Sequence, residues 1–236
     1  MNELDSIGIR FNTDKSSQAR ARGEGVLDGG RRGHDYLRKY DFFFKGMRKS
    51  PNLRMMELGI GPDWNMGAST KVWVQYFSAP GFVLHMVDIN ENARVFADAD
   101  VRVTVGDLGD ISFLEKLSSD SYDIIIDDAS HFWGHQIEAL VVLFNSVVDG
   151  GIYVIEDIHT SFGERRERYR KGAEVDAHTL LMALASFVAG DRRSHPSLNK
   201  ALTPKLEQSV RLLSKNVESV TFIRHSCIIC KQGYFS

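Results

Sequence analysis

Residues 122–131 read Tyr-Asp-Ile-Ile-Ile-Asp-Asp-Ala-Ser-His, a short apolar run that ends in acids and a histidine. Residues 151–159 repeat this arrangement as Gly-Ile-Tyr-Val-Ile-Glu-Asp-Ile-His. Short apolar runs of this kind are typical of buried strands in a parallel sheet. Open α/β sheets bind their ligands at the carboxyl ends of such strands, so we expect both acidic clusters at a ligand site.

Strand-like and helix-like segments alternate around these two runs. We predict strands at 54–58, 82–88, 101–107, 122–126 and 151–155, helices at 71–77, 111–117, 136–147 and 178–188, and two final strands near 218–224 and 226–231. This order predicts an α/β fold with a doubly wound, mostly parallel seven-stranded sheet and a C-terminal antiparallel hairpin at one edge. With the parallel strands in the order 3-2-1-4-5, the two acid-bearing strands are neighbours.

The chain has 236 residues, of which 43% are apolar and 25% charged, which is enough for one good core. We expect one domain over residues 51–236. Residues 1–50 are polar and are expected to be irregular, forming an N-terminal lid or substrate segment with a mobile Gly- and Arg-rich loop from Gly23 to Gly33.

A formal net charge of −2 gives no reason to expect nucleic acid or an anionic membrane as a partner. No apolar run approaches the roughly 18 residues needed to span a bilayer, and the first residues lack the pattern of a signal peptide. We therefore expect a cytoplasmic protein. Cys227 and Cys230 form a CxxC, but on a strand their side chains would point to opposite faces, which favours buried structural cysteines over a redox pair.

The two acidic clusters offer a set of hard oxygen ligands in Asp128, Glu156 and Asp157, which suits magnesium, calcium or manganese. His131, three residues after Asp128, can act as a general base beside the metal, or can simply cap the following helix. A zinc pair of His131 and His135 is disfavoured because Phe132 occupies the place of the glutamate in an HExxH motif. His159 is expected to contact substrate or to make a structural hydrogen bond.

The turn after the first strand predicts the organic cofactor. Its Gly59-Ile-Gly61 allows a close backbone approach, but position 64 is Trp64 rather than the glycine expected for NAD. S-adenosylmethionine carries no phosphate and does not need that glycine. Asp88 is expected on the ribose and Asp107 on the adenine, unless they are ordinary turn or capping residues.

Several of these segments together resemble a known family, the metal-dependent sugar O-methyltransferases of natural-product pathways, which include macrolide deoxysugar enzymes and are similar to the cephalosporin hydroxylase family. The resemblance covers most of residues 7–160, and an insert around Pro62–Met66 departs from it. Its motifs are Thr13-Asp14-Lys15, Glu57-x-Gly59, Gly67-x-Ser69-x-x-x-Trp73, Asp128-Ala-Ser-His131 and Glu156-Asp157.

This resemblance implies a Rossmann-like class I methyltransferase fold, S-adenosylmethionine and Mg²⁺ as cofactors, and a homo-oligomer. It also implies that Asp128, Glu156 and Asp157 bind magnesium and that His131 is the catalytic base. The expected cofactor residues are Glu57, Gly59, Gly61, Gly67, Ser69, Asp88, Asp107 and Asp127.

The acceptor implied by the resemblance is a sugar hydroxyl, on a free sugar, a nucleotide-linked sugar or a glycoside. Methylation of an amino-sugar nitrogen, an oxidative tailoring reaction and a catalytically silent binding module are the alternatives. A silent module is disfavoured, because a cluster of like charges is costly without a cation. The charged run Arg165–Lys171 is expected to be a solvated face, or else a clasp for an anionic group.

Overall fold

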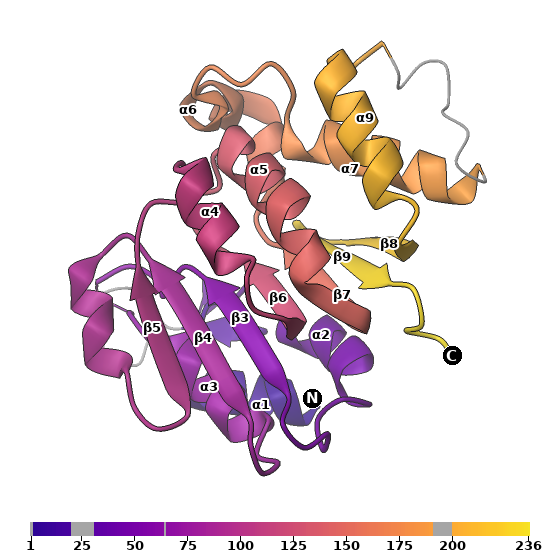
Figure 1. Ribbon diagram of the computed structural model, residues 1–236. Coiled ribbons are helices and arrows are strands. Elements are labelled where there is room, and N and C mark those ends of the chain that lie inside the picture. Colours follow the sequence, from indigo (N-terminus) through magenta and orange to yellow (C-terminus); the bar gives the residue numbers. More distant parts are fainter. Residues whose placement is uncertain (1, 20–30, 64, 191–199) are drawn as a thin grey trace. The chain divides into compact units, whose positions relative to one another are not determined.

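The computed structural model describes residues 2–19, 31–63, 65–190 and 200–236 (Figure 1). Trp64 and most of the predicted Gly23–Gly33 loop lie outside the described residues. The chain divides into two compact units, Met1–Gly106 and Asp107–Ser236.

The first unit contains three parallel strands, β3 (Arg54–Leu58), β4 (Val83–Asp88) and β5 (Val101–Val105). Helix α3 (Ala68–Tyr76) connects β3 to β4, and the 3-10 helix η1 (Glu91–Phe96) precedes β5. The central residues of β3 and β4 are buried, as expected for strands of a parallel sheet. The predicted strands of this unit are therefore confirmed.

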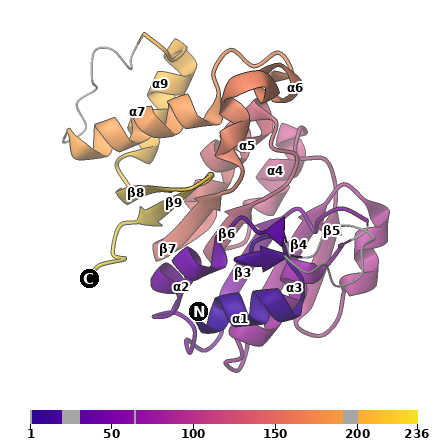
Figure 2. The same ribbon diagram turned by 180° about the vertical axis from the view of Figure 1, so that it is seen from behind.

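Residues 1–50 were predicted to be irregular, and this prediction is wrong. The segment forms helices α1 (Glu3–Arg10) and α2 (Leu37–Phe44) and a small antiparallel pair, β1 (Gln18–Ala19) with β2 (Arg31–Arg32). Both helices have only eight residues, so the apolar stripe that each buries is too short to give a clear helical period in the sequence. Helix α1 packs against α2 and α3 (Figure 2).

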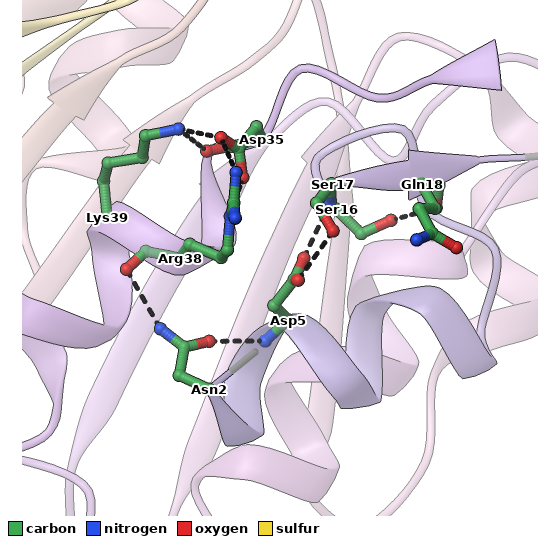
Figure 3. Close-up of polar contacts among 8 residues, drawn as sticks. All are labelled: Asn2, Asp5, Ser16, Ser17, Gln18, Asp35, Arg38 and Lys39. Atoms are coloured by element: carbon green, nitrogen blue, oxygen red, sulfur yellow. Dashed lines mark hydrogen bonds and ion pairs between the residues drawn. The ribbon is translucent and has the colours of Figure 1, made fainter.

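Polar contacts fix this N-terminal segment within the first unit (Figure 3). The Asp5 carboxylate accepts hydrogen bonds from the backbone N–H and the hydroxyl of Ser17, each at 2.7 Å. Asn2 caps α1 through the Asp5 amide and donates to the Arg38 carbonyl at 3.0 Å. The role of residues 1–50 as a lid stays a prediction.

The second unit contains four strands, of which β6 (Tyr122–Asp127) and β7 (Val147–Ile155) are parallel. Strand β9 (Ser226–Lys231) is antiparallel to both β7 and β8 (Val217–Ile223). The longer helices that the structure describes in this unit are α4 (Ile111–Leu117), α5 (Trp133–Leu143), α7 (Ala177–Ala189) and α9 (Pro204–Leu213), with 3-10 helix η2 (Phe144–Ser146) after α5. Asp110, Asp176 and Thr203 cap α4, α7 and α9 with their side-chain oxygens.

The sequence prediction differs from the second unit at helices α5 and α9, among other places. The predicted helix 136–147 begins earlier and ends at Leu143, because β7 begins already at Val147. Helix α9 was not predicted, although Thr203 followed by Pro204 is a recognisable helix start.

The strand order is β5-β4-β3-β6-β7-β9-β8. This confirms the predicted α/β class with a mostly parallel seven-stranded sheet and a C-terminal antiparallel pair. Cys227 and Cys230 are free and buried on β9, as predicted, and burial raises the pKa of the Cys227 thiol. Within the described ranges no helix has the length and apolar character needed to cross a membrane.

Candidate active site

Parallel pairing of β6 and β7 brings the two predicted acidic clusters to the same edge of the second unit. Asp127 lies opposite Ile155 in the register, and the Glu156 amide donates to the Asp127 carbonyl at 2.9 Å. Asp128 and Asp157 therefore follow the ends of neighbouring strands, where the sequence predicted a ligand site.

Three side chains converge at this edge. Asp128, His131 and Asp157 each offer one ligand atom, and these atoms all lie within 4.8 Å of one another. The Nε2 atom of His131 is 3.5 Å from Oδ2 of Asp157. Two carboxylates this close repel each other unless a cation or a proton joins them. The two carboxylates suit a hard divalent cation such as Mg²⁺ or Mn²⁺, and the His131 imidazole lies beside them.

The backbone is strained at two of the three converging residues. His131 has a φ of 57° and Asp157 a φ of 55°, in the left-handed region. This conformation costs a non-glycine residue about 1–2 kcal/mol. The Asp157 carbonyl accepts hydrogen bonds from the amide and the hydroxyl of Thr160, at 3.1 and 3.0 Å, which hold the turn. Strain of this kind concentrates at functional sites.

Glu156, a predicted metal ligand, does not belong to the converging group among the described residues. It is buried, and its backbone carbonyl accepts a hydrogen bond from Gln136 Nε2 at 2.9 Å. His131 stands in the group where Glu156 was expected. The assignment of Glu156 as a ligand stays a prediction.

His135 also lies outside the converging group. His135 is on the first turn of α5, and its Nδ1 lies 3.0 Å from the Ser130 hydroxyl. The structure therefore gives no support to a zinc pair made of His131 and His135.

The charged run Arg165–Lys171 lies next to this site. It forms the end of η4 (Gly163–Arg165) and helix α6 (Arg166–Arg170), and its arginines are exposed. The ring of Tyr169 is half-buried, with its centroid 6.3 Å from that of His131 and 6.2 Å from that of Phe132. The arginines of the run are thus solvated, while its Tyr169 ring lies near the ring of the candidate base His131.

In the first unit, the predicted cofactor residues Glu57 and Ser69 bind each other. Oε2 of Glu57 accepts hydrogen bonds from the Ser69 hydroxyl at 2.8 Å and from the Trp73 indole at 2.9 Å. Lys15 Nζ lies 3.4 Å from Oε1 of the same carboxylate. These contacts connect the motifs at Lys15, Glu57 and Ser69–Trp73 and show that Glu57 fixes the end of β3 from inside the fold.

Three predicted cofactor glycines surround the turn between β3 and α3. Gly59 and Gly61 have φ angles of 93° and 96°, which L-residues with side chains rarely adopt. At Gly67, before the first residue of α3, φ is 74° and an added Cβ would lie 2.2 Å from the Phe96 ring. The turn therefore requires glycine, and it leaves Gly61 exposed at the carboxyl end of β3.

Asp88 at the end of β4 supports the same turn. Its Oδ2 accepts a hydrogen bond from the Ile60 amide and its Oδ1 one from the Asn90 amide, both at 2.8 Å. Asp88 is half-exposed, so its carboxylate can still meet a ligand. Asp88 therefore stabilises the turn, which was one of the two roles expected from the sequence. Cofactor binding by Asp88 stays a prediction.

The other two predicted cofactor acids belong to the second unit. Asp107 is exposed and accepts a hydrogen bond from the Gly109 amide at 2.8 Å. Asp127 is buried. Burial raises the pKa of the Tyr153 hydroxyl well above its usual value, and the nearby Asp127 carboxylate raises it further. Cofactor binding by both acids also stays a prediction.

Comparison with known proteins finds sugar O-methyltransferases. The chain is 33% identical over 135 residues to mycinamicin VI 2''-O-methyltransferase of Micromonospora griseorubida, a match that covers 55% of this chain and 33% of that protein. It is 30% identical over 164 residues to L-olivosyl-oleandolide 3-O-methyltransferase of Streptomyces antibioticus, with 67% of this chain and 38% of that protein covered. The matched region thus spans less than two fifths of these relatives' own length. No family model matches the chain.

Among solved structures, the chain resembles the MycE methyltransferase of the mycinamycin pathway. The complex of MycE with Mg, SAH and mycinamycin VI gives a TM-score of 0.72 at 22% identity, covering 98% of this chain and 55% of MycE. A crystal form with Mg and SAH gives 0.72 at 24% identity, covering 98% and 54%. The predicted class I methyltransferase fold and the resemblance to sugar O-methyltransferases are confirmed. These matches do not show the expected relation to the cephalosporin hydroxylase family.

Proposed function

From this similarity to sugar O-methyltransferases, we propose that the chain transfers a methyl group from S-adenosylmethionine to a sugar hydroxyl of a natural-product glycoside. The observation that carries the proposal is the convergence of Asp128, His131 and Asp157 at the carboxyl ends of β6 and β7. The relatives are named for methylation of sugars on macrolides and tetracenomycins, which supports a glycosidic acceptor. A homo-oligomer and a cytoplasmic location stay predictions.

We place a divalent cation, Mg²⁺, at the converging group, with Asp128 and Asp157 as its ligands and Glu156 as a further proposed one. When bound, this ion supplies a Lewis acid and a template for adjacent hydroxyls of the acceptor. The two carboxylates gather negative charge at the strand ends, and the strained backbone at Asp157 fixes one of them there.

His131 is the proposed general base. Its Nε2 faces the Asp157 carboxylate, so a neutral imidazole with its proton on Nε2 keeps the lone pair on Nδ1. Among the described residues, that buried Nδ1 has no hydrogen-bond partner. We propose that the His131 imidazole takes the proton of the acceptor hydroxyl as the oxygen–methyl bond forms and the sulfur–methyl bond breaks. Cofactor binding is assigned to the residues around the β3 turn, Asp88, Asp107 and Asp127.

The direct test is transfer of a labelled methyl group from S-adenosylmethionine to a panel of deoxysugar glycosides, followed by mass spectrometry of the products. We expect an O-methylated sugar in the presence of Mg²⁺, loss of product with EDTA, and recovery when Mg²⁺ is restored. Asp157→Asn should abolish transfer, whereas Asp149→Asn, a change of an exposed acid on β7, should not. Full transfer in metal-free buffer would exclude the proposed mechanism. Product methylated on an amino-sugar nitrogen would exclude the proposed acceptor.

A further inference from the structure

The Asp157 carboxylate has an imidazole beside each of its oxygens. His131 Nε2 lies 3.5 Å from Oδ2, while His159 Nδ1 lies 3.7 Å from Oδ1. His159 is on the 3-10 helix η3 (Ile158–Ser161), and its side chain is largely buried. The proposed reaction uses His131 and leaves His159 without a role.

Arg165 determines which nitrogen of His159 carries the proton when the ring is neutral; at 3.7 Å, Nδ1 lies near Oδ1 of Asp157 but beyond hydrogen-bond length. The Arg165 guanidinium Nη1 is in hydrogen-bond contact with His159 Nε2. A guanidinium has only N–H donors, so Nε2 must accept. A neutral His159 therefore carries its proton on Nδ1, the nitrogen that faces Asp157.

His225 supports the same imidazole from the turn between β8 and β9. The ring centroids of His159 and His225 are 4.4 Å apart. The His225 carbonyl accepts a hydrogen bond from the Ile158 amide at 2.9 Å, and His225 has a φ of 64°, a strained value for a residue with a side chain. This hydrogen bond connects the β8–β9 turn to the start of η3, next to Asp157.

We infer that His159 is a positioning residue for the Asp157 carboxylate, oriented by Arg165 and supported by His225. This inference rests on the proposed cation site. Carboxylates that bind metals are commonly held by hydrogen bonds from outer residues, and loss of such a partner typically costs about 10–100-fold in metal affinity or activity. In this arrangement His159 orients the Asp157 carboxylate toward the proposed cation from the Oδ1 side. His131, on the Oδ2 side, remains free to act as the base.

Mn²⁺ binding, measured by electron paramagnetic resonance on the purified chain without substrate, tests the inference. His159→Leu removes the imidazole N–H that lies beside Oδ1 of Asp157 and should weaken Mn²⁺ binding about 10-fold. His159→Asn keeps a side-chain N–H near the position of Nδ1 and should recover most of that loss. Arg165→Gln should weaken binding to an intermediate degree.

Matched controls come from the same unit. His178→Leu removes a histidine that packs between Phe162 and Phe222, and Arg168→Gln removes an exposed arginine of α6. Both should bind Mn²⁺ as the unchanged protein does. Equal binding by His159→Leu and the unchanged protein overturns the inference, and so does an equal loss in His159→Leu and His159→Asn.

Asp157→Asn separates the inference from the proposed function. If Asp157→Asn loses Mn²⁺ binding but His159→Leu does not, the cation site stands and only the role of His159 is wrong. If Asp157→Asn binds Mn²⁺ as tightly as the unchanged protein, the cation site itself is wrong, and the proposed mechanism fails with it.

Discussion

Lys15 and Glu57 form an ion pair that is closed to solvent. Lys15 Nζ lies 3.4 Å from Glu57 Oε1, and the two side chains are 3% and 0% exposed. The pair joins the N-terminal segment to the end of β3, where the glycine-containing turn begins. The pair thus links two motifs that are 42 positions apart in the sequence, at Lys15 and at Glu57.

Loss of Lys15 should destabilise the first unit. Removing one partner of a buried ion pair leaves the other charge unpaired and costs about 3–5 kcal/mol. We expect Lys15→Met to lower the free energy of unfolding by about 3 kcal/mol in denaturant titrations. Lys71→Met, a change at an exposed lysine of α3, should have little effect.

The double variant Lys15→Met with Glu57→Gln tests the cause of that loss. A glutamine can still accept from Ser69 and Trp73 but carries no charge, so part of the stability should return. A double variant less stable than Lys15→Met would show that the loss comes from packing rather than from the unpaired carboxylate.

Gly67→Ala should disrupt the start of α3. The new Cβ would meet the Phe96 ring at 2.2 Å, and the positive φ adds about 1–2 kcal/mol of strain. The expected result is a lower melting temperature together with weaker binding of S-adenosylhomocysteine in calorimetry. Gly46→Ala is the matched control, because an added Cβ there has no neighbour within 4 Å among the described residues. Equal melting temperatures for the two variants would contradict this account of the turn.

Asp88→Asn should weaken cofactor binding. The change removes the charge expected to meet the ribose hydroxyls, and it also leaves only one oxygen to accept from the Ile60 and Asn90 amides. Calorimetric titration with S-adenosylmethionine should show the loss, whereas Asp100→Asn, at an exposed acid of the same unit, should bind normally. Unchanged affinity in Asp88→Asn would remove Asp88 from the cofactor site.

His131→Ala should lower kcat by roughly 10²-fold or more while cofactor and acceptor binding stay nearly intact, because a general base acts on the transition state. His135→Ala is the control, since His135 contacts Ser130 and lies outside the converging group. A His131→Ala enzyme with normal kcat would mean that solvent takes the proton and that His131 has a structural role.

The strands and the acidic edge were predictable because buried parallel strands are continuous apolar runs, and the residues that follow them must meet at one edge. All three residues of the converging group were candidate site residues in the sequence, but the sequence did not predict which of the candidates would lie together. His131 and Asp157 reach this group through positive φ angles, which no pattern of side-chain types reveals at non-glycine positions. Glu156 follows its strand as directly as Asp157 does, so both were equally expected in the group.

The N-terminal helices and the supporting contacts of Asp157 were missed for a related reason. Helices α1 and α2 are stabilised by packing against α3 and each other, rather than by a long apolar period of their own. Arg165 and His225 reach His159 only because the η4–α6 segment and the β8–β9 turn lie beside η3 in the folded unit. The sequence pattern does not predict this proximity. The only local signal was the position of His159 two residues after Asp157, and it did not distinguish a structural from a functional histidine.

The most direct test of the central claim is a crystal structure of the protein with Mn²⁺, using the anomalous signal of the ion to locate it. The account predicts one strong peak bound by carboxylate oxygens of Asp128 and Asp157 at about 2 Å, with His131 beside it. The same map decides whether Glu156 joins the site. A Mn²⁺ peak away from Asp128 and Asp157, or no ordered ion at saturating Mn²⁺, would contradict the account.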